Sequence, residues 1–194
     1  MLKREDLKGK WQSTKIETIE NPDGSVMYIK RKALFVDDNW DIFIIAFLDD
    51  EGKKPLFTIH ARGSYILGEE SADLTGAVAV DFNNKARYVT PHHQSMVDML
   101  NETNFEEDWI LEKEYDVSSK VCLLVPSIKT SPLEYDVVKI QENKIYFGEF
   151  TVEQKEDIKK LTQENHNPSE FSEGICSKDN RPRQLIKYPM IKAK

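Results

Sequence analysis

The chain has 194 residues, 39% of them hydrophobic, and a formal net charge of −7 at pH 7. A chain of this length can bury a core without disulfide or metal support, and its acidic balance repels the phosphate backbone of nucleic acids. No window approaches the roughly 18 consecutive apolar residues of a membrane span, and the first residues hold no apolar signal segment. We therefore expect no nucleic-acid partner, no integral membrane segment, and a cytoplasmic location unless a secretion leader has been removed.

Potential metal ligands and thiols are scattered along the chain. Cys122 and Cys176 have no CxxC spacing, and we expect two ordinary thiols. His92 and His93 are adjacent, and neighbouring side chains on a helix point about 100° apart, so they are not expected to share an ion. The sequence also lacks GxSxG, HExxH, Walker and GxGxxG motifs. We predict no metal, no cofactor and no enzymatic activity.

Residues 9–90 have the pattern of antiparallel strands separated by tight turns. Turn chemistry occurs at residues 21–24, 37–39 and 49–52, where Asn, Asp, Pro and Gly cluster. The segments between these turns are about ten residues long and rich in β-branched and aromatic side chains. None of the connections is long enough for the crossover that a parallel sheet needs. Residues 73–82 and 85–90 continue this meander across a predicted turn at Asn83-Asn84.

Alternation along these strands assigns their two faces. In residues 26–36 the set opposite Lys30 and Lys32 is mostly apolar and should face inward, although it includes Arg31. A two-residue turn near Asp38 would continue that inner face on the next strand. The predicted inner wall is free of charge apart from Arg31 and comprises Met27, Ile29, Arg31, Ala33, Phe35, Trp40, Ile42, Ile44, Ala46, Phe57, Ile59, Ala61, Gly63 and Tyr65. The outward set on the second strand is Phe43, Ile45 and Phe47, and later helices are candidates to cover it.

The second half of the chain is less regular. Pro91 opens a predicted helix over residues 91–101, and residues 102–132 have no clean period. A hairpin is expected at 134–150, followed by an exposed helix that begins near Val152 and a loop at 165–180. The tail from Arg181 has two further prolines, so it could add a closing strand only at an edge or a seam.

Eight or nine antiparallel strands in up-and-down order are most economically arranged as a closed, lipocalin-like β-barrel with one or two short α-helices. Closure leaves no exposed sheet edge. We expect one domain over residues 1–194, with core strands at about 9–90, 134–150 and 183–191.

Several segments resemble a known family. Gly9-Lys10-Trp11 is similar to the opening of lipocalins and intracellular fatty-acid-binding proteins, in which Trp closes the barrel floor. The chain also resembles the adenomatosis polyposis coli down-regulated domain over about residues 7–102, and more loosely at 146–148 and 181–185. The segments that carry this resemblance are GKWQST, Tyr28–Arg31, Pro55–Ile59, Arg62-Gly63, Gly76 with Asp81-Phe82, and Val89–Pro91.

The resemblance implies a lipocalin-like barrel that takes up a lipid or acyl chain. The animal members of that family are secreted or membrane-anchored Wnt antagonists. Ile16 and Lys53 stand where those members have Cys, which favours a reducing compartment and argues against the extracellular role.

The inner wall supplies the candidate ligand-binding residues, which are Trp11, Met27, Ile29, Arg31, Phe35, Trp40, Ile42, Ile44, Phe57, Ile59 and Tyr65. Arg31 has two interpretations, because a guanidinium on an apolar wall is costly unless it is paired. It could clamp an anionic head group of a ligand, or it could pair with a buried carboxylate such as Glu17 or Asp81 or stack on Trp11.

Three classes of function remain open. The first is a non-enzymatic barrel that binds a small hydrophobic, fatty-acid-like molecule. The second is an enzyme, which would need an inward titratable group such as Glu17, Asp81 or His60 beside the cavity. The third is an interaction module with a filled interior, in which Phe43, Ile45 and Phe47 dock a partner or form a homodimer.

Overall fold

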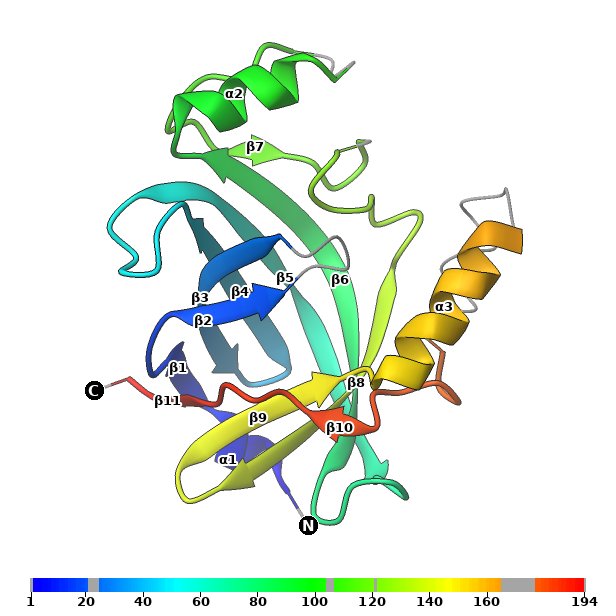
Figure 1. Cartoon of the computed structure of the whole chain (residues 1–194). Coiled ribbons are helices and arrows are strands. Elements are labelled where there is room, and N and C mark those ends of the chain that lie inside the picture. Colours follow the sequence, from blue (N-terminus) through cyan, green and yellow to red (C-terminus); the bar gives the residue numbers. More distant parts are fainter. Residues whose placement is uncertain (1, 21–24, 104–106, 121, 165–176, 194) are drawn as a thin grey trace.

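The structure is a computed structural model that describes residues 2–20, 25–103, 107–120, 122–164 and 177–193 (Figure 1). Most of this chain forms antiparallel strands, and the helices are short. The elements in chain order are α1 (Arg4–Leu7), β1 (Gly9–Ser13), β2 (Glu17–Glu20), β3 (Val26–Val36), β4 (Asn39–Phe47), β5 (Pro55–Glu70), β6 (Val78–Pro91), α2 (Gln94–Asn101), β7 (Tyr115–Asp116), β8 (Leu133–Gln141), β9 (Lys144–Glu149), α3 (Val152–Glu164), β10 (Gln184–Leu185) and β11 (Met190–Lys192).

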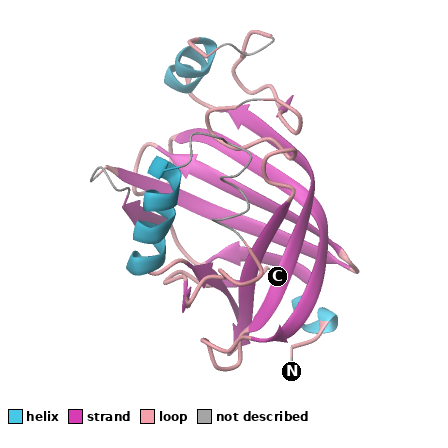
Figure 2. Cartoon of the chain, turned by 90° about the vertical axis from the view of Figure 1, so that its right-hand side faces the viewer, coloured by secondary structure: helices cyan, strands magenta, loops and turns pink. Residues whose placement is uncertain are grey.

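The strands close into a barrel. The ring runs β1-β11-β9-β8-β6-β5-β4-β3 and returns to β1, because β1 pairs with both β3 and β11. Strands β2, β7 and β10 extend this ring by pairing with β3, β6 and β9. Figure 2 shows the long strands curving around a common axis, with α3 outside them. The predicted antiparallel lipocalin-like barrel is confirmed, with eight strands in the closed ring and three short helices in the described chain.

The C-terminal tail makes the closure. β11 lies between β9 and β1, with Met190 opposite both Ile145 and Ser13. The tail is interrupted before Pro189, so it pairs with β9 as two short strands. The predicted closing strand therefore exists, and it lies at the seam.

The predicted faces of β3 and β4 are confirmed. Val36 pairs with Asn39 across the two-residue turn at Asp37-Asp38, and Phe35 pairs with Trp40. Asp37 has a φ of 51°, the left-handed conformation that such a turn requires and that Asp tolerates. The register then places Arg31 opposite Ile44, so the guanidinium does extend from the inner wall.

The predicted turn within β6 is wrong. Asn83-Asn84 is not a turn, because β6 runs unbroken from Val78 to Pro91 and the real turn precedes it. The pairing of β5 with β6 shifts at Gly63 instead, and a Cβ at Gly63 would lie 1.8 Å from the carbonyl oxygen of Asn83. A glycine therefore lets the two backbones approach at an irregularity that looked like a turn in the sequence.

Pro91 does not open the helix that follows. It is the last residue of β6, and α2 begins at Gln94. His93 is the N-cap residue, and its Nδ1 accepts a hydrogen bond from Ser95 N at 3.3 Å. The helix thus begins after a capping side chain rather than at the proline.

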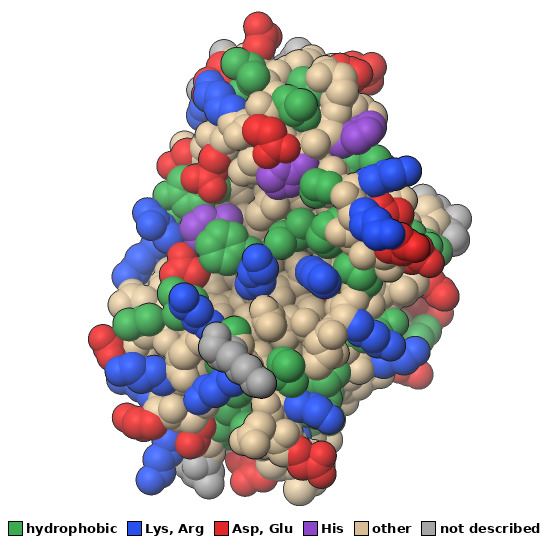
Figure 3. Space-filling view, turned by 90° about the vertical axis from the view of Figure 1, so that its left-hand side faces the viewer, with side chains coloured by type: hydrophobic (Ala, Val, Ile, Leu, Met, Phe, Trp, Pro, Cys, Tyr) green, Lys and Arg blue, Asp and Glu red, His purple; other side chains and the backbone are tan. Residues whose placement is uncertain are grey.

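The helices do not cover the outer face of β4. α2 lies beyond the end of the barrel wall, and its buried residues pack with Val89 and Phe57. On the outer face Phe43 stacks on His60, with ring centroids 4.1 Å apart. Hydrophobic side chains on the face shown in Figure 3 are interspersed with Lys, Arg and His side chains. A homodimer through Phe43, Ile45 and Phe47 stays a prediction.

The buried apolar residues form two clusters, one at each end of the barrel. The floor cluster lies near α1 and contains Trp11, Phe35, Trp40, Tyr65 and Phe82 among others. The mouth cluster joins Ile29 and Phe57 to residues of α2 and of the segment from Trp109 to Val125. Residues 102–132, which had no clean period, therefore supply part of the mouth. No helix in the described chain is long and apolar enough to cross a membrane.

Some predictions fall outside the described residues. These are the turn at 21–24, most of the loop at 165–180, and Cys176. Cys122 is partly buried and packs against the mouth cluster.

Candidate functional site

A cavity of about 180 Å³ lies inside the barrel between the two clusters. Its apolar lining comes from four strands and includes four aromatic rings of the floor cluster. Its polar lining comes from Arg31 on β3, Asp41 on β4, and Glu134 and Asp136 on β8. The full lining is Arg31, Ala33, Phe35, Trp40, Asp41, Ile42, Ile44, Phe82, Glu134, Asp136, Phe147 and Gly148. Six of these residues are buried, five are partly buried and Glu134 is exposed, so about half of the lining is shielded from water.

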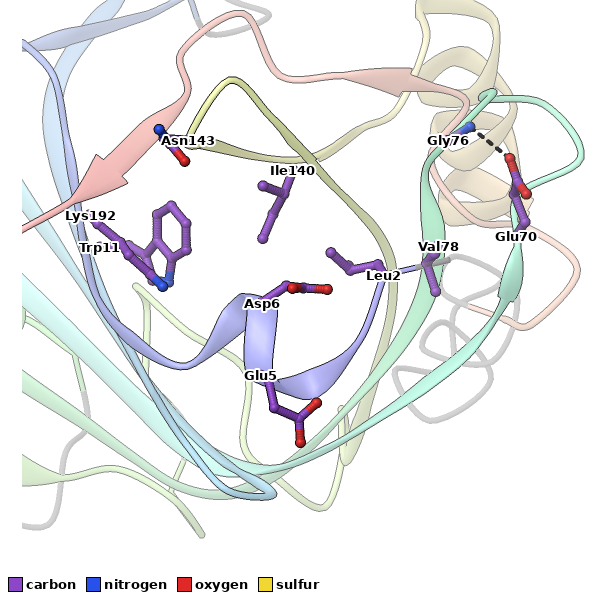
Figure 4. A pocket seen from close by; sticks show the side chains of 10 residues that line it. All are labelled: Leu2, Glu5, Asp6, Trp11, Glu70, Gly76, Val78, Ile140, Asn143 and Lys192. Atoms are coloured by element: carbon purple, nitrogen blue, oxygen red, sulfur yellow. Dashed lines mark hydrogen bonds between the residues drawn. The ribbon is translucent and has the colours of Figure 1, made fainter.

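A larger hollow of about 770 Å³ lies at the closed end, beside α1. Figure 4 shows Leu2 and Asp6 of the N-terminal segment facing Ile140 across it, with Trp11 to one side and Glu70 accepting a hydrogen bond from Gly76 N. Most of its lining residues are exposed. A solvent-exposed hollow desolvates a ligand poorly, so the interior cavity is the candidate site.

Arg31 is buried and paired. Its side chain is 7% exposed, and its Nε lies 3.0 Å from both carboxylate oxygens of Glu17, which is fully buried. Its Nη2 donates to the carbonyl oxygen of Tyr188 at 2.6 Å, and Glu17 also accepts a hydrogen bond from Ser13 Oγ. Of the two interpretations of Arg31, the buried carboxylate partner is the one observed. In the described chain Nη1 has no hydrogen-bond partner.

A second buried arginine lies on the same inner face, which corrects the expectation that Arg31 is the one charge there. Arg87 pairs with Ala61 in register, and its side chain is 3% exposed. It donates to the carbonyl oxygens of Pro126, Ser127 and Ser131 and forms an ion pair with Glu134 at 2.9 Å. Arg87 thus ties the segment before β8 to the barrel wall.

Asp136 is the carboxyl group of the cavity that lacks a cation of its own. It lies opposite Val80, a fully buried residue of the floor cluster, so it shares the inner face. Its Oδ1 accepts hydrogen bonds from Val137 N at 2.7 Å and Gly148 N at 2.9 Å. Burial raises the pKa of Asp136 to about 7, against the lowering effect of these two hydrogen bonds and of Arg31.

Gly148 makes room for that carboxyl group. A Cβ at this position would lie 2.4 Å from Asp136 Oδ1 and 2.5 Å from Pro182 Cβ. Only a residue without a side chain fits there, because Asp136 on β8 and Pro182 in the C-terminal tail occupy the space that a Cβ would need. The cavity is therefore lined both by the Asp136 carboxyl group, which two backbone N–H groups hold in place, and by the buried Arg31 guanidinium.

The predicted ligand-binding residues separate into three groups. Five of the eleven line the cavity, namely Arg31, Phe35, Trp40, Ile42 and Ile44. Trp11 and Tyr65 belong to the floor cluster, where Trp11 Nε1 donates to Leu7 O at 2.6 Å and Tyr65 OH donates to Asp37 O at 3.0 Å. Met27, Ile29, Phe57 and Ile59 belong to the mouth cluster.

Asp136 and Glu134 in the cavity, and Arg87 beside Glu134, were not predicted from the sequence. In β8 both alternating sets mix polar and apolar residues, and Val137 and Val138 are both buried, so period 2 assigns no face. Arg87 follows the irregularity opposite Gly63, which shifts the alternation along β6. The Phe147-Gly148 pair was a usable signal, because a glycine inside a strand often marks a close approach.

The remaining candidate groups lie elsewhere. His60 faces outward and lies 2.9 Å from Asp41 Oδ1, and Asp81 pairs with Arg181. His92 contacts Thr58 and Glu112. Within the residues that the structure describes, no three His, Cys, Asp or Glu side chains are grouped to hold a metal ion.

The sequence matches the family Adenomatosis polyposis coli down-regulated 1 over residues 1–160, which is more than half of the chain. The chain belongs to this family. The matched region extends beyond the segments that carried the resemblance, to β8, β9 and the start of α3. It therefore includes every residue that lines the cavity of this family member.

Proposed function

We propose that this protein is a binding protein for a small hydrophobic molecule, held in the cavity between the floor and mouth clusters. The observation that carries the proposal is the lining itself, in which aromatic and aliphatic side chains surround a few convergent polar groups. Such a composition is typical of small-molecule sites. Family membership and the barrel fold support the same function.

The volume of the cavity limits the ligand. A cavity of about 150 Å³ with an apolar lining is known to hold benzene, so 180 Å³ suits a molecule of about seven non-hydrogen atoms. A long acyl chain would need the mouth cluster to move aside. We therefore propose a short or compact ligand, or the end of a longer one.

Native mass spectrometry of the freshly purified protein, followed by solvent extraction, tests the proposal. We expect a bound molecule, or uptake of cyclohexanol by the emptied protein. Ile44→Trp should abolish uptake, because it places an indole in the cavity, whereas Ile45→Trp on the outer face of the same strand should not. Equal uptake by both variants, or none by the wild type, would contradict the proposal.

An interaction module is the second candidate function, and the two filled clusters favour it. Light scattering should then reveal a stable dimer that Phe43→Ser disrupts, with no small molecule bound. The absence of enzymatic activity stays a prediction.

A further inference from the structure

We infer that the cavity selects ligands that carry a neutral oxygen group, a carbonyl or a hydroxyl, held between Arg31 and Asp136. This inference rests on the proposed function and names the class of ligand. It differs from the expectation that Arg31 clamps an anionic head group.

The charges around the cavity are the first reason. Arg31 is paired with Glu17, and Arg87 is paired with Glu134. The lining and its ion-pair partners therefore hold two guanidinium groups and four carboxyl groups. Asp41 lies 2.9 Å from His60 Nε2, whereas Asp136 has no side-chain partner of its own in the described chain. A carboxylate ligand would add an uncompensated negative charge to this site whether Asp136 is protonated or ionised, and such a charge is costly.

The hydrogen-bonding capacity is the second reason. Among the described residues Arg31 Nη1 has no acceptor, although the side chain is more than nine-tenths buried. Asp136 uses Oδ1 for two backbone N–H groups, and Oδ2 accepts no hydrogen bond from the described chain. An ammonium ligand could not accept from Nη1, whereas a neutral oxygen can.

The protonation state of Asp136 distinguishes the two kinds of neutral group. The groups facing it are Arg31 from β3, with Glu17 behind it, and Glu134 on its own strand, while Arg181 donates to its carbonyl oxygen. The pKa of about 7 means that below neutral pH the protonated carboxyl can donate to a ligand carbonyl. Above neutral pH the ionised carboxylate repels a carbonyl oxygen and still accepts from a hydroxyl.

Five compact probes test the inference, because they have similar apolar bodies and differ in their polar group. They are cyclohexane, cyclohexanone, cyclohexanol, cyclopentanecarboxylate and cyclohexylammonium. At pH 6 we expect both neutral oxygen compounds to bind at least roughly tenfold more tightly than the hydrocarbon and the two ions. The amide signals of Gly148 and Val137 in NMR titrations report binding directly, because both N–H groups donate to Asp136.

Between pH 6 and pH 8 the affinity for cyclohexanone should fall, while that for cyclohexanol should change little. Asp136→Asn retains an oxygen for the two backbone N–H groups and places an amide donor in the cavity, so its affinity for cyclohexanone should be independent of pH. The double variant R31M/E17Q removes the guanidinium without stranding Glu17, and it should lose the preference for cyclohexanone over cyclohexane.

Three results would overturn the inference. Tighter binding of the carboxylate or of the ammonium would show that charge is selected. Equal binding of cyclohexane and cyclohexanone would show that the cavity binds by apolar contact alone, which leaves the proposed function intact. Binding of none of the five probes would remove the proposed function together with this inference.

Discussion

Arg31 and Arg87 are both buried on the inner face of the barrel, yet their surroundings differ. Arg87 uses its two terminal nitrogens on three carbonyl groups and on Glu134, whose side chain is 48% exposed. Arg31 pairs through Nε with Glu17, which is fully buried, and its Nη1 has no partner in the described chain. Both terminal nitrogens of Arg87 are therefore bonded to protein groups, whereas Arg31 keeps one terminal nitrogen without an acceptor in the described chain, beside a cavity that it lines.

Use of both terminal nitrogens by protein groups indicates a structural role, whereas an unused terminal donor at a cavity indicates binding. The two ion pairs also differ in what their loss would expose. Removal of Arg31 strands a carboxylate that water cannot reach, while removal of Arg87 strands one that is already half in solvent. Four substitutions test whether the two arginines have these different roles.

The largest effect is expected for Arg31→Met. It should lower the free energy of unfolding by about 4 kcal/mol, because Glu17 is left as a buried and uncompensated charge. Urea denaturation at pH 7 measures the loss. R31M/E17Q is the matched control and should recover most of it; equal losses in the single and double variants would mean that the ion pair is not coupled.

Arg87→Met should cost less, about 3 kcal/mol, since Glu134 can be hydrated when its partner is lost. The loss should come mainly from the three unpaired carbonyl groups of the segment that precedes β8. Hydrogen exchange should therefore accelerate in residues 122–134. A loss greater than that of Arg31→Met would reverse the assignment of the two roles.

Asp136→Asn should change stability in a pH-dependent way. The pKa of Asp136 is raised from 3.8 to about 7 in the folded protein, so the folded state holds the proton more tightly than the unfolded state. The unfolding free energy of the wild type should consequently fall as pH rises from about 4 to about 7.

The variant has no such group, so the difference in unfolding free energy between the two proteins should change in favour of the variant between pH 4 and pH 8. The full rise of the pKa from 3.8 to about 7 corresponds to about 4 kcal/mol. Because Asp136 is only partly buried, we expect roughly 1–3 kcal/mol of this. Chemical denaturation across this range measures the difference. A constant offset between the two proteins would show that Asp136 titrates normally.

The smallest effect is expected for Arg62→Met. Arg62 is exposed on β5 and donates to Tyr88 OH at 3.0 Å on the outer face. Its replacement should change the free energy of unfolding by less than about 0.5 kcal/mol. This variant controls for the general effect of removing an arginine; a loss as large as that of Arg87→Met would mean that burial does not explain the difference.

The barrel could be predicted because local signals agreed along the first half of the chain. Turn residues at Asp37-Asp38 set the pairing of β3 with β4, and period 2 then placed Arg31, Phe35 and Ile44 on one face. The same logic failed at Asn83-Asn84, where the irregularity depends on the absence of a side chain at Gly63 on another strand.

The antiparallel meander, the inner face of its first strands and the burial of one arginine there follow from alternation and turn chemistry between neighbours in the chain. The folded barrel was needed to show that Glu17 neutralises Arg31, that Arg87 joins it inside the barrel, and that Asp136 lies beside a small cavity without a cation of its own in the described chain. The two ion pairs join residues 14 and 47 positions apart, and no periodicity within a single strand specifies which charges will meet across a closed barrel.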